Sequence, residues 1–156
     1  MNEVIKKDNV LKTITPEENL FLANKILQVI ANGENNEEDE LPIQHDVHDG
    51  VYYRTFMLPK NHFCFGALLK VPTTLIFHGD CYVSMGMGVE RLKGYRVLKG
   101  MPFRRQVFLA LEDTWMTMCY RTDSTDVQEI EKEFTDEWML LTTRREDLEK
   151  EMLTDG

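Results

Sequence analysis

The run from Val51 to Tyr120 constrains this chain most, because it alternates short apolar segments with turn signals and contains no long helical pattern. Segments rich in β-branched and aromatic residues, cut by Gly, Pro, Asn or Asp, are typical of strands joined by turns. Several such segments at close spacing predict an all-β barrel or sandwich and not a parallel sheet. The predicted strands are 51–58, 63–71, 74–77, 81–85, 95–98, 103–109 and 115–120.

Helical patterns lie on both sides of this run. Thr15–Glu18 combines an N-cap hydroxyl, a proline at the first helical position and a capping-box glutamate, and apolar residues then recur at helical spacing up to Asn32. A second capping box, Thr125–Gln128, begins another helical pattern. We therefore expect an N-terminal helix with an acidic linker over 1–40, a β-barrel over 41–122, and a helical C-terminal tail over 123–156.

Composition excludes several classes of function. The net charge of -9, from 27 acidic and 18 basic residues, argues against general binding to nucleic acid or to anionic membranes. No apolar run reaches the ~18 residues of a membrane span, and residues 1–13 lack the apolar core of a signal peptide. The cysteines Cys64, Cys81 and Cys119 are scattered through apolar segments without C-x-x-C spacing, which predicts buried free thiols in a reducing cytoplasm.

An ordered series of local features carries a resemblance to a known family. Gly50–Arg54 opens the barrel, His78–Asp80 and Gly100–Arg105 stand at turns between its strands, and Glu112–Trp115 stands at the last hairpin. Over 42–134 the chain resembles the small single-domain cupins of bacteriophages and prophages. The resemblance implies a mainly β fold, a cupin-like jelly-roll barrel with an N-terminal helix and a short helical C-terminal tail.

The resemblance also implies what the barrel lacks. Metal-binding cupins carry a His-x-His pair and a Glu in a first motif and another His in a second; here Pro72 and Thr74 replace the pair, and the segment after Pro102 has no histidine. Imidazole or carboxylate ligands must converge to hold such a metal. We therefore predict no metal site, no cofactor and no catalytic residue, and hence no enzyme. A metal-dependent enzyme with a non-standard site built from His45, His48 or His78 stays open as a third alternative.

Basic and aromatic residues are the candidate ligand-binding groups. Arg104 and Arg105, with the basic residues between Arg91 and Lys99, form the basic cluster of an acidic chain. Such a cluster could bind a phosphate, a nucleotide or an acidic partner segment through guanidinium groups, or form salt bridges with carboxylates in neighbouring subunits or helices. Aromatic side chains at a barrel mouth could stack on a base or a sugar. The candidate ligand-binding residues are Arg54, His78, Tyr82, Arg104, Arg105 and Trp115.

Two apolar surfaces predict association. The wide apolar face of helix 16–32 and the patch Trp138–Leu141 are more than a small barrel covers by itself. The leading hypothesis is a homo-oligomeric, non-catalytic binding or assembly protein in a virion or the host cytoplasm, with a phage structural protein or a host protein as partner. The alternative is a protein that sequesters a small anionic or nucleotide-derived ligand at the barrel mouth.

Overall fold

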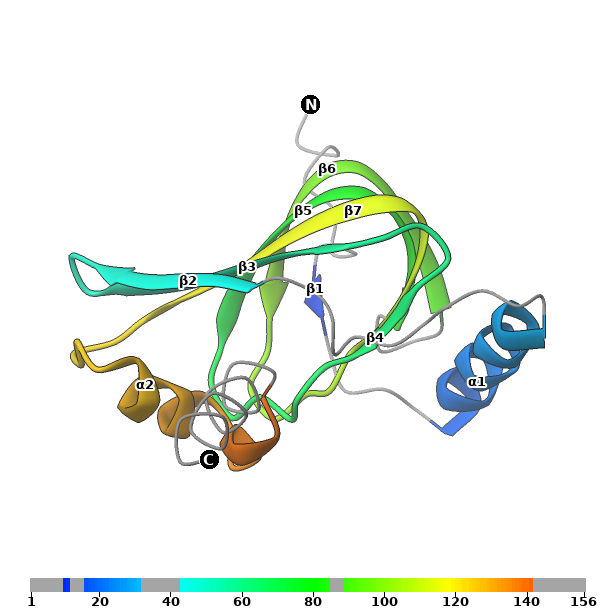
Figure 1. The fold of residues 1–156 in the computed structure, drawn as a ribbon. Helices are drawn as coiled ribbons and strands as arrows, with labels where there is room; N and C mark the ends of the chain where they lie inside the picture. Colours follow the sequence, from blue (N-terminus) through cyan, green and yellow to red (C-terminus); the bar gives the residue numbers. More distant parts are fainter. Residues whose placement is uncertain (1–9, 12–15, 32–42, 85–88, 142–156) are drawn as a thin grey trace, which may run out of the picture.

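The computed structural model describes residues 10–11, 16–31, 43–84 and 89–141 (Figure 1). The mainly β class predicted from the sequence is confirmed. The predicted acidic linker, residues 85–88 and the part of the predicted C-terminal tail over 142–156 lie outside the described residues. The elements in chain order are β1 (Val10–Leu11), α1 (Pro16–Ala31), β2 (Ile43–His48), β3 (Val51–Leu58), β4 (Phe63–Phe65), β5 (Thr73–Ser84), β6 (Val89–Gly100), β7 (Val107–Arg121), α2 (Val127–Phe134) and the 3₁₀ helix η4 (Trp138–Leu140).

The strands form a seven-stranded sheet in which β7 holds the central position. The order is β1-β6-β5-β7-β3-β2, and β4 also pairs with β7. On one side β7 pairs with β5; on the other it pairs first with β4, through 107–109, and then with β3, through 114–121. In Figure 1 the strands β5, β6 and β7 arch over together, so the sheet curls around its own inner face.

Several predicted turns are bends inside long strands. The predicted segment 74–77 and the described part of the segment 81–85, residues 81–84, belong to one strand, β5, and the segments 103–109 and 115–120 belong largely to β7. The turn predicted at His78–Asp80 is an irregularity in the β5–β7 register, and Glu112–Asp113 lies opposite it within β7. Both predictions were wrong because glycine and aspartate serve a β-bulge as readily as a chain reversal.

Two shorter segments also differ from the expectation. Strand β4 covers only 63–65 of the predicted 63–71, and the segment 43–48, which is not among the predicted strands, is strand β2 paired with β3. Helix α1 ends at Ala31, close to the predicted boundary, and α2 begins at Val127 with Asp126 as its N-cap. The side chain of Asp126 accepts hydrogen bonds from the backbone N–H groups of Gln128 and Glu129.

The inner face of the sheet is packed with apolar side chains. A first cluster of buried residues includes Phe77, Leu98 and Met116 from three neighbouring strands. A second cluster joins the sheet to α2 through Tyr52 and Tyr120. The thiols of Cys64 and Cys81 are buried as predicted, and burial raises the pKa of Cys81 to about 12; Cys119 is only partly buried. No helix among the described residues is long and apolar enough to cross a membrane.

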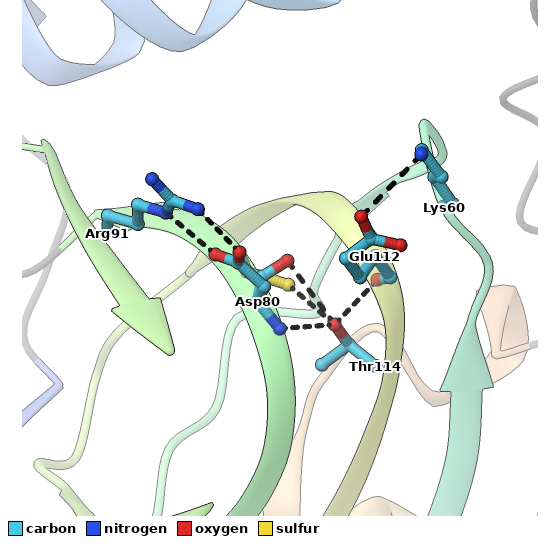
Figure 2. A network of polar contacts seen from close by, with 6 residues as sticks. Lys60, Asp80, Arg91, Glu112 and Thr114 are labelled. Carbon is cyan, nitrogen blue, oxygen red and sulfur yellow. Dashed lines mark hydrogen bonds and ion pairs between the residues drawn. The ribbon is translucent and has the colours of Figure 1, made fainter. Parts of the chain in front are cut away.

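At the bend in β5 the backbone of Gly79 lies very close to that of Thr114 on β7. At Gly79 an added Cβ would lie 2.6 Å from Cα of Thr114 on β7. Next to this contact, the backbone N–H of Asp80 donates to Oγ1 of Thr114 over 3.1 Å, and the Cys81 thiol donates to the same atom. The Thr114 hydroxyl donates in turn to the carbonyl oxygen of Glu112 (Figure 2). One threonine therefore satisfies the polar groups that the irregular register removes from the ladder.

An ion pair joins the same bend to β6. Arg91 donates to both carboxylate oxygens of Asp80, over 2.9 Å from Nε and 2.6 Å from Nη2 (Figure 2). The Asp80 side chain is nearly inaccessible, whereas Arg91 is half exposed. The hydrogen bonds from Arg91 hold the pKa of Asp80 below its usual value, although burial acts in the opposite direction. Asp80 therefore stays ionised in the folded protein and ties β5 to β6.

Replacement of the bend glycine is expected to be strongly destabilising. Gly79→Ala would force a methyl group into the backbone of Thr114, and overpacking of this kind costs about 1–3 kcal/mol or more in unfolding free energy. Gly66→Ala is the matched control, because its added Cβ would lie 3.3 Å from the Gln106 carbonyl oxygen, and we expect a loss within about 1 kcal/mol. Urea unfolding measures both. Equal losses for the two variants would contradict the close approach at Gly79.

Removal of the Asp80 charge is expected to give a pH-dependent loss of stability. The lowered folded-state pKa of Asp80 stabilises the protein above the unfolded-state value of about 4, and this contribution disappears as the pH falls through the folded-state pKa. Asp80→Asn should therefore be less stable than the wild type at neutral pH, and the difference in unfolding free energy should narrow below about pH 4. Urea unfolding at a series of pH values from neutral to acidic measures this difference in unfolding free energy. Asp123→Asn, at an exposed position, is the control. A difference that is independent of pH would contradict the role of the ion pair.

Candidate functional site

Arg104, one of the predicted ligand-binding residues, lies in the interior and not at a barrel mouth. Its side chain is 2 % exposed. It donates to the carbonyl oxygen of Met101 over 2.8 Å and to the hydroxyl of Thr73, and its guanidinium lies against the backbone of Gly100. Among the described residues no carboxylate pairs with it, and burial lowers its pKa to about 10. Through these contacts, Arg104 holds the end of β6 against the segment that leads into β7.

Arg54 and Arg105 are engaged by the chain's own acidic residues. Arg54, on β3, lies 3.7 Å from the carboxylate of Glu131, which is fully buried on α2. Arg105 pairs with Glu137, just after the same helix. Lys70 repeats the arrangement with Asp136 over 2.8 Å. Three cations of the barrel therefore bind the acidic α2–η4 segment, so an internal acidic segment takes the place that the sequence suggested for an anionic ligand.

The histidines of the third alternative are spread over the sheet. His45 and His48 lie on β2, where a separation of three residues directs their side chains to opposite faces. His45 contacts the hydroxyl of Tyr52 over 3.2 Å, whereas His48 is exposed. His78 is on the outer face of β5. Within the described ranges, no three His, Cys, Asp or Glu side chains lie close enough together to hold a metal ion.

The basic residues of β6 also divide between the two faces of the sheet. Arg91 and Lys93 are exposed on the outer side, and Arg91 is bound to Asp80. Arg96 has the opposite parity in the strand and is partly buried. Only part of the predicted cluster therefore shares a face.

Two predicted residues, His78 and Trp115, are brought together on the outer face of the sheet. They are direct cross-strand partners in the β5–β7 register, and His78 is also opposite Tyr95 on β6. The rings of His78 and Tyr95 meet edge to face with centroids 6.2 Å apart. Trp115 is 55 % exposed and Tyr95 is 64 % exposed. These residues form an aromatic row on a surface that an antiparallel sheet ordinarily covers with polar side chains.

Apolar side chains continue in the rows beside it. Val97, which is 47 % exposed, is opposite Ile76 on β5, and Ile76 is opposite Thr117 on β7. The hydroxyls of Thr117 and Thr55 lie 2.7 Å apart and hydrogen-bond to each other, so they leave mainly their methyl groups to the surface. We call this surface the outer patch, with the members Tyr53, Met57, Ile76, His78, Tyr95, Val97 and Trp115.

The sequence indicated only part of the outer patch. Tyr95 and Val97 were not among the predicted site residues, because dense aromatic and aliphatic residues in strands are usually core. The signal that would have found them is strand parity: once 89–100 is read as one strand, Leu92 and Leu98 take the inner face, and Tyr95 and Val97 take the outer face.

The remaining predicted residues lie elsewhere. Tyr82 is partly buried at the far end of β5, where its ring meets Phe21 of α1 edge to face with centroids 6.3 Å apart. Helix α1 thus covers this end of the barrel, although Leu20 and Leu27 remain exposed. In the predicted Trp138–Leu141 patch, Leu141 packs against the second core cluster and Lys132 lies over the Trp138 ring.

Comparisons with known proteins show similarity in fold only. No protein family and no curated protein matches the sequence. Among solved structures, a cupin superfamily protein from Desulfitobacterium hafniense has 13% sequence identity to this chain and a TM-score of 0.45. The similar region covers 60% of this chain and 88% of the Desulfitobacterium protein.

Two further structures are similar at the same distant level. Salicylate 1,2-dioxygenase from Pseudaminobacter salicylatoxidans has 12% identity and a TM-score of 0.49, covering 75% of this chain and 35% of its own. The Cupin_2 domain of an XRE family transcriptional regulator from Enterobacter cloacae has 4% identity and a TM-score of 0.42, covering 51% of this chain and 95% of its own. These proteins include an enzyme and a regulator, and none of their activities is carried over to this chain.

Proposed function

We propose that this chain is a non-catalytic binding or assembly protein whose working surface is the outer patch. The observation that carries the proposal is the exposure of Trp115, Tyr95 and Val97 on one face of the sheet, where β5 separates Trp115 from the other two. Large exposed apolar patches are characteristic of interaction sites, and Trp and Tyr are the residues that contribute most at protein interfaces. A sheet face also holds its side chains in a fixed arrangement, which lowers the entropic cost of binding.

The interior of the barrel supports the same choice. The inner faces of the central strands carry Phe77, Leu98 and Met116, each almost inaccessible to solvent. The buried charges Asp80 and Glu131 are held by arginines of the same chain. A reaction centre or an anion site in this interior would have to break these contacts. A sequestering role for an anionic ligand is therefore less well supported than binding through the outer face.

The class of partner follows from charge and from the phage-type resemblance. A net charge of -9 disfavours nucleic acid, and an aromatic and aliphatic surface fits a protein. We propose a phage structural protein, a host protein or another copy of the chain as the partner, in the host cytoplasm or in a virion.

Photo-crosslinking from the outer patch tests the proposal. Benzoylphenylalanine in place of Trp115 should give discrete protein adducts when cells producing the chain are irradiated, because the benzophenone would lie inside the interface. Benzoylphenylalanine in place of Met139, which is 51 % exposed on η4, is the matched control and should give a several-fold lower yield of adducts. Gel analysis and mass spectrometry identify the adducts, and circular dichroism verifies folding.

A second substitution makes the test specific for the surface. Val97→Asp places a charge in the outer patch and should remove the adducts formed from position 115, because burying an unpaired charge is costly. Equal adduct yields at positions 115 and 139, or adducts that survive Val97→Asp in a folded chain, would contradict the proposal.

A further inference from the structure

We propose that the outer patch binds a second copy of this chain, face to face, about a twofold axis parallel to β7. This inference rests on the proposed function, in which the outer patch binds protein, and it names the occupant. The argument uses the cross-strand rows of the outer face, the position of two opposite charges in one of them, and the side chains at the centre.

The charges are placed symmetrically about β7. In the row through Cys119, Thr74 and Lys99 lie one and two strands away on one side. Tyr53 and Asp46 lie one and two strands away on the other side. Both Lys99 and Asp46 are exposed, so one row carries a cation and an anion at equal distances from its centre.

A twofold axis along β7 brings these charges together. Two sheets that face each other through identical surfaces are related by an axis that lies in the interface plane. If the axis runs parallel to β7, the two sides of each row are exchanged, and Lys99 of each copy meets Asp46 of the other. An axis perpendicular to the strands would instead place Lys99 opposite Tyr95. Charge complementarity therefore selects the parallel axis, with two ion pairs in the dimer.

The same axis places an anchor on the midline of the contact. Trp115, Thr117 and Cys119 project from the outer face of β7, so each would face its own counterpart. A tryptophan that is surrounded by less energetic contacts is the usual anchor of an interface hot spot. The Thr117 hydroxyl is bonded to Thr55, so it would not be left unpaired when water is excluded. The centre is thus apolar and the charges lie at its edges.

The size of the surface predicts a weak dimer. Five strands spaced ~4.8 Å apart and five residues at ~3.4 Å per residue cover on the order of 400 Å² on each copy. Stable interfaces bury about 800 Å² on each partner. We therefore expect a dimer that dissociates in the micromolar range or above, and whose population depends on protein concentration.

Sedimentation over a range from low micromolar to several hundred micromolar tests the dimer. Lys99→Asp and Asp46→Lys should each weaken dimerisation by about threefold or more, and the combined charge swap should restore it to within about twofold. Trp115→Ser should weaken dimerisation by about tenfold or more. The far-ultraviolet spectrum and the melting temperature of each variant verify that it is folded.

Cys119 provides a second measurement, which reports the geometry of the contact. Facing sheets lie ~10 Å apart, so two Cys119 thiols across the axis lie within reach of a short bismaleimide. The reagent should join two wild-type chains, and Cys119→Ser and Trp115→Ser should each abolish the product, whereas Cys81→Ser, which alters a buried thiol, should not.

The outcomes separate this inference from the proposed function. Dimerisation that follows the charge swap and yields the Cys119 product supports the twofold arrangement. A chain that stays monomeric at every concentration, or a dimer indifferent to all of these substitutions, overturns it. If benzoylphenylalanine at position 115 gives discrete adducts only with a different protein, the proposed function stands and the second copy is rejected.

Discussion

The close approach of Gly79 to Thr114 is the constraint on which the rest of the structure depends. It allows the neighbouring strands β5 and β7 to bend together without separating. Because β7 continues through the bend, one part of it pairs with β3 and another with β4. The same continuity encloses an apolar interior on one face and aligns Tyr95, His78 and Trp115 in a row on the other. The core and the outer patch are thus two consequences of one backbone contact.

The sequence predicted the fold well where local signals are unambiguous and less well where they have two meanings. Strand β3 has the predicted bounds of Val51–Leu58, because alternation and a terminal proline define it locally. Gly79–Asp80 was assigned to a turn, since a bulge and a reversal favour the same residues. Only the long-range pairing of β5 with β7 distinguishes them, and nothing local in the sequence records that pairing. Strand β2, which is not among the predicted strands, likewise depends on a pairing with β3 that nothing local in the segment records.

The candidate site shows the same limit at the level of side chains. His78 and Trp115 were chosen separately and are 37 residues apart, and the register makes them neighbours. Their partner Tyr95 was missed because its face is decided by the continuity of β6. Arg54 and Arg105 were predicted as ligand-binding residues, and composition could not show that their carboxylate partners within the chain are Glu131 and Glu137. Residue types predict which interactions are available, and topology decides which are made.

The distribution of charge explains why this acidic chain would bind a partner through an uncharged surface. Three arginines of the barrel are engaged by its own acids at two structural positions: Arg91 holds the bend through Asp80, and Arg54 and Arg105 hold the α2–η4 segment. Each of these contacts lowers the cost of keeping a carboxylate in a poorly solvated place. With these guanidinium groups committed to the fold, the outer face around Trp115 presents mostly apolar side chains, and burial of that surface is the main favourable term left for binding a partner.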